Sequence, residues 1–308
     1  MTRESTPGPV APAPTGAGVQ APLELLAEVT VIVVTYNSAH CLAALDPLLG
    51  ACPHVFISDN GSGDGTADAA RRRWPHAGVL EHGRNLGFGA ANNRALEATT
   101  TPFALLINPD CELPAAGLAE LVRHAQAMPE AAMLAPQLVS ASGRPDINYR
   151  WPRTLWRSRG PAADGPLCVG FLTGAAMLLR RERCGAAGFF DEDFFLYYED
   201  DDLCLRLFQA RLPMVLVPAV VAMHRNRGSV RGAKPWRGEY WRGYHHAQSK
   251  LTYALKHRSR LAARRLYWAT LATTALALPF RALIFNRRLL ARMLGRWFGL
   301  LHWSGHAG

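Results

Sequence analysis

The stretch from Val29 to Thr35 reads VTVIVVT, a run of seven residues that are all apolar or β-branched. Such a run is typical of a strand buried on both faces, as in a parallel sheet covered by helices. It ends at Tyr36-Asn37-Ser38, and residues 41–49 are expected to form a helix. A buried strand followed by a helix is the repeating unit of α/β proteins, so this stretch predicts that fold class.

Three further segments with strand composition follow, at residues 55–58, 79–81 and 103–107. The turn-forming cluster 59–66 separates the first of these from a helix, and residues 91–98 are expected to form another helix. Four strand-then-helix units predict a mainly parallel sheet flanked by helices.

Polar clusters follow three of the four expected strands, namely Tyr36-Asn37, Asp59-Asn60 and Asn108-Pro109-Asp110. Ligands of parallel sheets bind beyond the carboxyl ends of the strands, where these clusters would meet. Each cluster alone has the composition of an ordinary turn, but together they indicate a binding site at this edge.

The middle of the chain is less regular. Residues 140–170 read as a loop-rich region that forms either a flexible lid or substrate wall, or a long connection whose aromatics pack locally. Its aromatic and basic residues are Tyr149, Arg150, Trp151, Trp156, Arg157 and Arg159. Residues 171–179 predict a strand whose small residues, 173–176, would let another group approach the backbone closely. A helix at 203–210 and short strands at 215–217 and 220–223 are expected to lead to His224.

The net charge of +10 comes from the C-terminal part of the chain. After Glu239 there are 12 Lys and Arg and no acid; removing these 12 from the total of 34 leaves 22 basic against 24 acidic residues. Because this basic part is also rich in Leu, Ala and Trp, it predicts contact with an anionic membrane surface rather than with nucleic acid. A solvated basic helix is the alternative.

Residues 266–280 are mostly apolar, but this stretch is shorter than the roughly 20 residues that span a bilayer. Beyond it, a basic amphipathic helix is expected to lie on the membrane, with Arg281, Arg288, Arg292 and Arg296 on one side.

The expected organisation is a disordered leader at residues 1–28, a catalytic domain at 29–230 and a basic helical extension at 231–308. The leader is rich in Pro, Ala, Gly and Thr and lacks the apolar core of a signal peptide. Six cysteines lie far apart without a C-x-x-C pair, which argues against a zinc site or a disulfide framework and fits a reducing compartment.

Several polar residues could bind a metal or a ligand or take part in catalysis. Asp110 is a hard oxygen ligand of the kind that Mg²⁺ or Mn²⁺ prefers, and His224 could be a further ligand or a structural histidine. Asp59 could accept a hydrogen bond from a nucleotide or form an Asx-turn. The four acids Glu199–Asp202 could supply a general base or cap a helix. The glycine-rich stretch 85–93 lacks the third glycine of a dinucleotide loop and does not follow the first strand, which argues against a Rossmann dehydrogenase.

Seven segments taken in order resemble glycosyltransferase family 2, the inverting enzymes of the GT-A fold: VIVVTYNS (31–38), ISDNGSGDGT (57–66), NLGFGAANN (85–93), LLINPD (105–110), TGAAMLLR (173–180), FDEDFFLYYEDDDLCLR (190–206) and HRNRGS (224–229). The N-P-D form and the FDEDFFLYYEDDDL block are most similar to bacterial rhamnosyltransferases and their galactofuranosyl relatives. The basic, aromatic C-terminal part is similar to rhamnosyltransferases that act on polyprenyl-diphosphate-linked sugars in cell-envelope assembly.

This resemblance implies a role for each matching residue. Asp200 would be the catalytic base, supported by Glu199, and Asp110 with His224 would bind the metal. Tyr36 and Asp59 would hold the nucleotide base, with Asn108 near the ribose or phosphates. The remaining residues of the expected donor site are Thr35, Asn37, Asn60, Asn85, Asn93 and Gly174. Two departures from the family pattern are Asn108, which replaces the first acid of a D-x-D motif, and Asp201-Asp202, which adjoin the expected base.

The resemblance implies transfer of a sugar, with L-rhamnose from dTDP-rhamnose preferred, to a hydroxyl of a polyprenyl-diphosphate-linked or glycan acceptor. The alternative is a galactofuranosyl or other hexosyl transferase that uses a UDP-sugar. A sugar nucleotidyltransferase would need a glycine- and lysine-rich loop after the first strand, and a non-catalytic membrane scaffold would be expected to lose Asp110 or the Asp200 cluster. The expected location is cytoplasmic, peripheral on the inner face of the cell membrane; homo-oligomer formation is left open.

Overall fold

The computed structural model describes residues 23–149, 158, 160–225, 235–283 and 286–306. Its helices are α1 (Leu23–Ala27), the 3-10 helix η1 (Ala39–Leu45), α2 (Asp46–Leu49), α3 (Thr66–Arg73), α4 (Phe88–Ala98), α5 (Ala115–Ala127), α6 (Arg181–Ala186), α7 (Glu199–Gln209), α8 (Pro235–His257), α9 (Arg260–Leu283), α10 (Arg287–Leu301) and the 3-10 helix η2 (Ser304–His306). Its strands are β1 (Val29–Thr35), β2 (His54–Asp59), β3 (Gly78–Glu81), β4 (Phe103–Ile107), β5 (Cys111–Glu112), β6 (Met133–Val139), β7 (Leu167–Val169), β8 (Ala176–Arg180) and β9 (Met214–His224).

The strands form one sheet in the order β3-β2-β1-β4-β8-β6-β9-β5, with β7 also paired to β9. The first four strands are mutually parallel, as the sequence predicts. Strand β8 runs antiparallel to β4 and to β6, and β9 runs parallel to β6. The α/β fold class is therefore confirmed, with an antiparallel strand inserted in the middle of the sheet.

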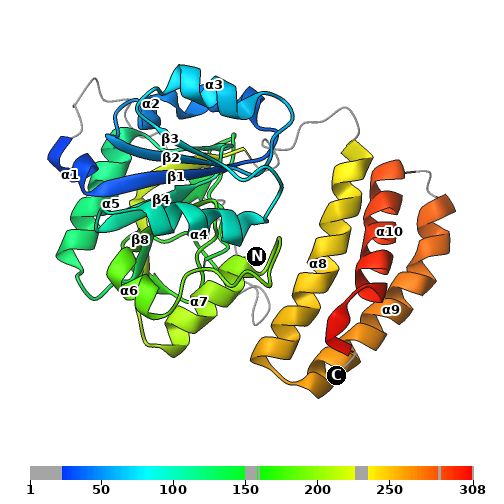
Figure 1. Cartoon of the computed structure of the whole chain (residues 1–308). Coiled ribbons are helices and arrows are strands. Elements are labelled where there is room, and N and C mark those ends of the chain that lie inside the picture. Colours follow the sequence, from blue (N-terminus) through cyan, green and yellow to red (C-terminus); the bar gives the residue numbers. More distant parts are fainter. Residues whose placement is uncertain (1–22, 150–157, 159, 226–234, 284–285, 307–308) are drawn as a thin grey trace, which may run out of the picture.

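Both faces of the sheet are covered, which explains the continuous apolar run of β1. Val31 and Val33 belong to the core beneath α2, α3 and α5, whereas Ile32 belongs to the core beneath α4, α6 and α7. Figure 1 shows these two helical layers on either side of the strands. Neighbouring residues of a strand point to opposite faces, so a strand between two cores needs apolar residues at every position.

Several boundaries differ from the sequence-based prediction. Helix α1 lies inside the expected leader, and its Leu26 is fully buried against the core. Residues 41–49 form a 3-10 helix followed by α2, because Pro47 fits the first turn of a new helix better than a helix interior. Strand β8 begins only at Ala176, so residues 171–175 are irregular.

Strand β9 is one continuous strand instead of two short ones. Its register against β6 shifts between Pro136 and Gln137, so that Val217 and Val221 pair with consecutive residues. Pro218 falls within this irregularity, where the N–H that proline lacks is not needed for the ladder. The strand can therefore continue to His224.

The C-terminal part forms a separate unit of three long helices, hereafter the helical unit, with α10 lying between α8 and α9 (Figure 1). Its own core includes Leu251, Ala263, Leu300 and Trp303. Gly243, Gly295 and Gly299 let α8 and α10 approach backbone to backbone, since a Cβ on Gly295 would lie 1.9 Å from the carbonyl oxygen of Tyr240. Among the described helices, none combines the length and apolarity needed to cross a bilayer.

Some predictions fall outside the described residues. These are the leader residues 1–22, the loop residues Arg150, Trp151, Trp156, Arg157 and Arg159, the end of the HRNRGS segment (226–229), and the boundary between the catalytic domain and the extension.

Candidate active site

The carboxyl ends of β1 and β2 are joined through Asp59. Its buried carboxylate accepts hydrogen bonds from Thr35 Oγ1 (2.8 Å), from Ser62 Oγ (2.6 Å) and from the Ser62 amide (2.9 Å). Asp59 therefore forms the Asx-turn that the sequence analysis gave as the alternative to nucleotide binding. The side chains of Thr35 and Asp59 are hydrogen-bonded to each other. Tyr36, in contrast, is 50% exposed beside them and presents its ring to solvent.

Asn37 adopts a left-handed backbone conformation (φ 53°) and connects the two loops. Its amide donates to Ser62 Oγ (2.8 Å), and its Oδ1 accepts from the Gly63 amide (2.9 Å). This pairing holds the two strand-end loops in one place. The edge that the sequence predicted as a binding site is thus a rigid, hydrogen-bonded platform.

Asn60, Asn85 and Asn93 also make internal contacts. Asn60 donates to the Gly87 carbonyl (3.0 Å) and accepts from the Leu86 amide (3.2 Å), while Asn85 Oδ1 accepts from the Gly87 amide (2.9 Å). Asn93 exchanges hydrogen bonds with the backbone of Phe190 (2.9 and 3.1 Å). These amides position the loop before α4 and the block before α7.

Asp110 and His224 lie together, as the sequence predicts. Antiparallel pairing of Cys111 with His224 brings the ring Nε2 to 3.5 Å from Asp110 Oδ1. Both side chains are largely buried, and the Asp110 carbonyl accepts from the Arg225 amide (3.0 Å). Asn108 sits at the end of β4 and is held by its amide, which donates to the Ala175 carbonyl (2.9 Å).

The four acids form the first turn of α7, four residues earlier than the predicted helix start. Tyr197 and Tyr198 precede them with φ near 70°, an uncommon conformation for bulky residues that turns the chain sharply into the helix. Of the four acids, Glu199, Asp201 and Asp202 are buried and Asp200 is partly open.

The carboxylate of Asp200 is oriented by two backbone amides. Gly174 N–H donates to Oδ2 (3.2 Å) and Asp201 N–H donates to Oδ1 (3.0 Å). The absence of a side chain at Gly174 also makes room for the Phe88 ring, which a Cβ would approach to 3.0 Å. The close approach that the small residues 173–176 predicted is therefore made by Phe88.

The pKa of the Glu199 carboxyl group is strongly shifted by its surroundings. Burial raises its pKa well above the usual value, and the charges of Asp200 and Asp201 raise it further. Its Oε2 has no hydrogen-bond partner among the described residues. The folded protein therefore favours the protonated form of Glu199 more than water does.

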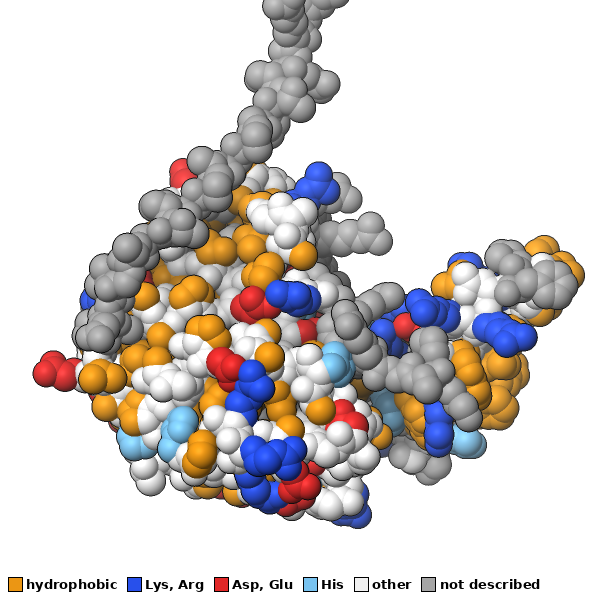
Figure 2. All heavy atoms as spheres, turned by 90° about the horizontal axis from the view of Figure 1, so that it is seen from above, with side chains coloured by type: hydrophobic (Ala, Val, Ile, Leu, Met, Phe, Trp, Pro, Cys, Tyr) orange, Lys and Arg blue, Asp and Glu red, His pale blue; other side chains and the backbone are white. Residues whose placement is uncertain are grey.

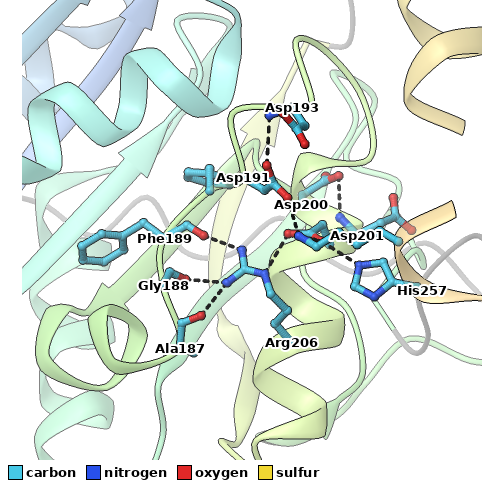
Figure 3. Close-up of polar contacts among 12 residues, drawn as sticks. Ala187, Gly188, Phe189, Asp191, Asp193, Asp200, Asp201, Arg206 and His257 are labelled. Atoms are coloured by element: carbon cyan, nitrogen blue, oxygen red, sulfur yellow. Dashed lines mark hydrogen bonds and ion pairs between the residues drawn. The ribbon is translucent and has the colours of Figure 1, made fainter. Parts of the chain in front are cut away.

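Asp202 joins α7 to the helical unit and is fully buried. It accepts from Arg206 Nε (2.8 Å), and Lys256 Nζ and His257 Nε2 each lie 2.7 Å away. Burial raises its pKa, but the hydrogen bonds and charges of these partners outweigh that effect and lower it. Figure 3 shows His257 facing the start of α7, and Arg206 reaching the carbonyls of Ala187, Gly188 and Phe189.

Further contacts dock α8 onto the same block. The Phe195 ring stacks on His245 at 4.1 Å, Ser249 Oγ donates to the Leu196 carbonyl (2.9 Å), and Tyr253 packs with Phe194 and Leu205. The sequence prediction treated the extension as a membrane-associating part and missed this role. The concentration of aromatics and histidines at 240–257 was the available signal.

A cavity of about 450 Å³ opens between the strand ends, α7 and the helical unit. It brings together the predicted residues Asn108, Gly174, Glu199, Asp200 and His224, and it adds His246 from α8 and Arg292 from α10. Thr35, Tyr36, Asp59 and Asn60 do not line it. A larger hollow of about 690 Å³ lies between β7 and the end of α7, and none of the predicted site residues lines it.

Comparison with known proteins agrees with this arrangement. Residues 30–184 match the family model of glycosyl transferase family 2. The N-acetylglucosaminyl-diphospho-decaprenol L-rhamnosyltransferase of Mycobacterium tuberculosis is 30% identical over 236 residues, covering 65% of this chain and 76% of that protein. The low-salt glycan biosynthesis hexosyltransferase Agl10 of Haloferax volcanii is 25% identical over 214 residues, covering 65% of this chain and 68% of that protein.

The fold is shared with a solved glycosyltransferase. The mannosyltransferase PcManGT from Pyrobaculum calidifontis, solved with GDP-Man and Mn²⁺, superposes with a TM-score of 0.52 at 19% identity, covering 89% of this chain and 86% of that one. On the match of the family model, the parallel sheet and the shared fold, the chain belongs to glycosyltransferase family 2 and is a glycosyltransferase of the GT-A fold.

Proposed function

We propose that the protein is an inverting hexosyltransferase that moves L-rhamnose from dTDP-rhamnose to a hydroxyl of a polyprenyl-diphosphate-linked sugar. The observation that carries this proposal is the placement of Asp200. It is the partly open member of the acidic block, and it lines the same cavity as Asn108 and His224. The mycobacterial relative, an N-acetylglucosaminyl-diphospho-decaprenol L-rhamnosyltransferase, supports this sugar and this acceptor class.

In the proposed reaction, the Asp200 carboxylate removes the proton of the acceptor hydroxyl. That oxygen forms a bond to the anomeric carbon from the face opposite the leaving group, while the bond from this carbon to the phosphate oxygen breaks. The nucleoside diphosphate leaves with the bonding electrons. A positioned general base contributes about 10²–10⁴-fold to such a step.

Glu199 would assist without acting as the base. Burial, and then the charge of Asp200, favour its protonated form, so Glu199 is less suited than Asp200 to accept the acceptor proton. The amides of Gly174 and Asp201 hold the Asp200 carboxylate in place. We propose that Tyr36 stacks on the nucleotide base and that Asp59, Thr35, Asn37, Asn60, Asn85 and Asn93 shape the surrounding loops.

Asp110 and His224 fit a divalent metal. A buried carboxylate lies within 3.5 Å of an imidazole nitrogen, and both are suitable ligands. The described residues hold no group of three or more His, Cys, Asp or Glu that could bind a metal, so diphosphate oxygens and water would complete the coordination. When bound, Mg²⁺ or Mn²⁺ would neutralise charge on the leaving diphosphate.

The donor is tested by binding and turnover. Calorimetry with dTDP-rhamnose and with UDP-sugars, followed by assay with an N-acetylglucosaminyl-diphospho-prenol acceptor, is expected to favour dTDP-rhamnose and to release dTDP without any nucleoside triphosphate. Preferred turnover of a UDP-sugar would support the hexosyl alternative. No transfer from either donor would contradict the proposed substrates.

We also propose that the protein lies on the inner face of the cell membrane through α9, because a lipid-linked acceptor resides in a bilayer. The α9 residues Trp268, Leu276 and Phe280 are 62%, 72% and 68% exposed, with Leu261 and Leu283 similarly open. Figure 2 shows such hydrophobic side chains next to Lys and Arg on the helical unit. This revises the expected surface, because Arg292 on α10 lines the cavity and is not part of an outer basic face.

Vesicle flotation of the full chain tests this surface. With anionic vesicles, Trp268→Glu combined with Phe280→Glu is expected to release the protein. Phe208→Glu, at an apolar residue of the catalytic unit that is 52% exposed, should leave flotation unchanged. Equal flotation of the α9 variant and the wild type would contradict the proposed surface.

A further inference from the structure

Three cationic side chains and one histidine of the helical unit gather beside the active-site cavity: Lys250 and His246 from α8, and Arg292 and Arg296 from α10, hereafter the basic cluster. His246 and Arg292 line the cavity directly. Lys250 and Arg296 are close enough to His246 for their charges to act on its ionisation. Arg296 also acts electrostatically on Tyr198, another residue of the cavity wall.

Acidic groups compensate only part of this charge. Glu239 pairs with Arg242 (2.9 Å) and lies 3.8 Å from Arg292. Burial and then the neighbouring cations lower the pKa of His246 to about 4, and they also lower the pKa of Lys250 and of Arg296. Partly buried like charges repel one another, so a bound anion would stabilise the arrangement.

The packing of α8 against α10 fixes the cluster. A Cβ on Gly243 would lie 2.1 Å from the Arg292 carbonyl oxygen and 3.0 Å from the Arg296 amide nitrogen. The two helices therefore meet at the turns that carry these arginines. Gly295 and Gly299 make the matching approach from α10. The backbone of α10 at Arg292 and Arg296 therefore lies against α8, and Arg292 Nη1 lies 3.8 Å from Glu239 of α8.

The position of the cluster identifies the anion as a diphosphate of the acceptor. Asn108 and His224, on the sheet side of the cavity, belong to the expected donor site, whereas His246 and Arg292 form its helical side. Asp200 lines the same cavity, which at about 450 Å³ can hold a sugar and an attached diphosphate. An acceptor sugar bound at Asp200 would thus extend its diphosphate toward the helical unit.

We propose that the basic cluster binds the diphosphate of a sugar-diphospho-lipid acceptor and so selects acceptors that carry this group. The proposal rests on the proposed function. It assigns to the helical unit a role in substrate recognition, in addition to the membrane contact of α9. Arginine pairs with phosphate through two parallel hydrogen bonds, which suits it to this task.

The test compares Arg292→Gln and Arg296→Gln with Arg288→Gln, an exposed arginine of the same helix. Each cluster variant is expected to raise the KM for a short-chain prenyl-diphospho-sugar by about tenfold or more, because a lost charge-assisted hydrogen bond has about that effect. The Kd for dTDP should not change, and neither should turnover of an alkyl glycoside acceptor without phosphate. Arg292→Lys should retain part of the affinity.

Inorganic pyrophosphate provides a second measurement on the unmodified enzyme. It should compete with the prenyl-diphospho-sugar more strongly than with dTDP-rhamnose. An unchanged KM for the acceptor in both glutamine variants would overturn the proposal, and so would an equal loss of dTDP affinity, which would assign the cluster to the donor diphosphate.

Failure of the proposed function would look different, since the wild-type enzyme itself would not turn over the prenyl-diphospho-sugar. Calorimetry with a prenyl diphosphate would then test the cluster alone. Binding that weakens in Arg292→Gln and Arg296→Gln but not in Arg288→Gln would support the site, and equal binding by all four proteins would refute it.

Discussion

Replacing Asp202 with alanine is expected to destabilise the protein strongly, because this carboxylate joins the catalytic unit to the helical unit. Asp202 is fully buried among Arg206, Lys256 and His257, at distances of 2.7–2.8 Å. Removing one member of a buried ion pair costs about 3–5 kcal/mol, because the remaining charge is left without compensation. Lys256 is 32% exposed and can regain water, so we expect the lower end, about 3 kcal/mol.

Urea unfolding measures the loss, and hydrogen exchange locates it. Exchange should rise in residues 249–257 of α8, where the helical unit contacts the catalytic unit, before it rises in β1 or β4. Asp191→Ala is the matched control, since Asp191 contacts the same lysine from a less buried position and should cost about 1 kcal/mol or less. A loss below about 1 kcal/mol for Asp202→Ala, or uniform exchange across both units, would refute this reasoning.

The same carboxylate predicts a pH dependence. The pKa of Asp202 is lower in the folded protein than its ordinary value of 3.8, so the folded state favours the ionised form. Its stabilising contribution is complete well above pH 3.8 and is lost as pH falls through the folded pKa. Asp202→Ala should therefore flatten the acid limb of the stability curve.

Three further predictions concern the site. Asp200→Asn should lower kcat by about 10²–10⁴-fold while leaving the Kd for dTDP nearly unchanged, and near-normal turnover would remove Asp200 as the base. Asp110→Ala should abolish the metal dependence of dTDP binding in calorimetry, and an unchanged metal dependence would contradict the ligand role. Glu199 has a raised folded pKa, so the wild-type protein should lose stability as pH rises from its ordinary value of 4.5 toward the folded pKa, by up to about 1.4 kcal/mol per pH unit. Glu199→Gln should lack this slope in urea titrations across pH, and a slope equal to that of the wild type would show that Glu199 is ionised in the folded state.

Much of the fold follows from local sequence. The limits of β1 and β4 could be predicted to the residue, because strands buried on both faces are apolar at every position and end abruptly at polar turns. The site edge at Asp110 was predictable for the same reason, since a polar residue after a buried strand must lie at the sheet edge. The pairing of Asp110 with His224 needed the family pattern as well, because 114 positions separate the two in the chain.

The contacts that the sequence did not predict are long-range. Asn60 and Asn93 have the composition of ligand-binding residues, yet Gly87 and Phe190 occupy their amides. Arg292 fits a helical spacing that suits a membrane surface, yet close packing of α10 on α8 through Gly243 and Gly295 places it at the cavity. Helical periodicity shows which residues share a face but not what that face contacts.

By itself, then, the sequence determined the parallel sheet, the polar ends of its strands and the acidic block, since each depends on neighbours within a few residues. The family resemblance favoured Asp200 over Asp202, two acids on one helical turn, but only the tertiary structure gives the physical difference between them. Asp200 opens into the cavity, whereas Lys256 and His257 of α8 enclose Asp202. Burial and charge pairing depend on chain segments more than 50 residues away, so no local pattern distinguishes the two carboxylates.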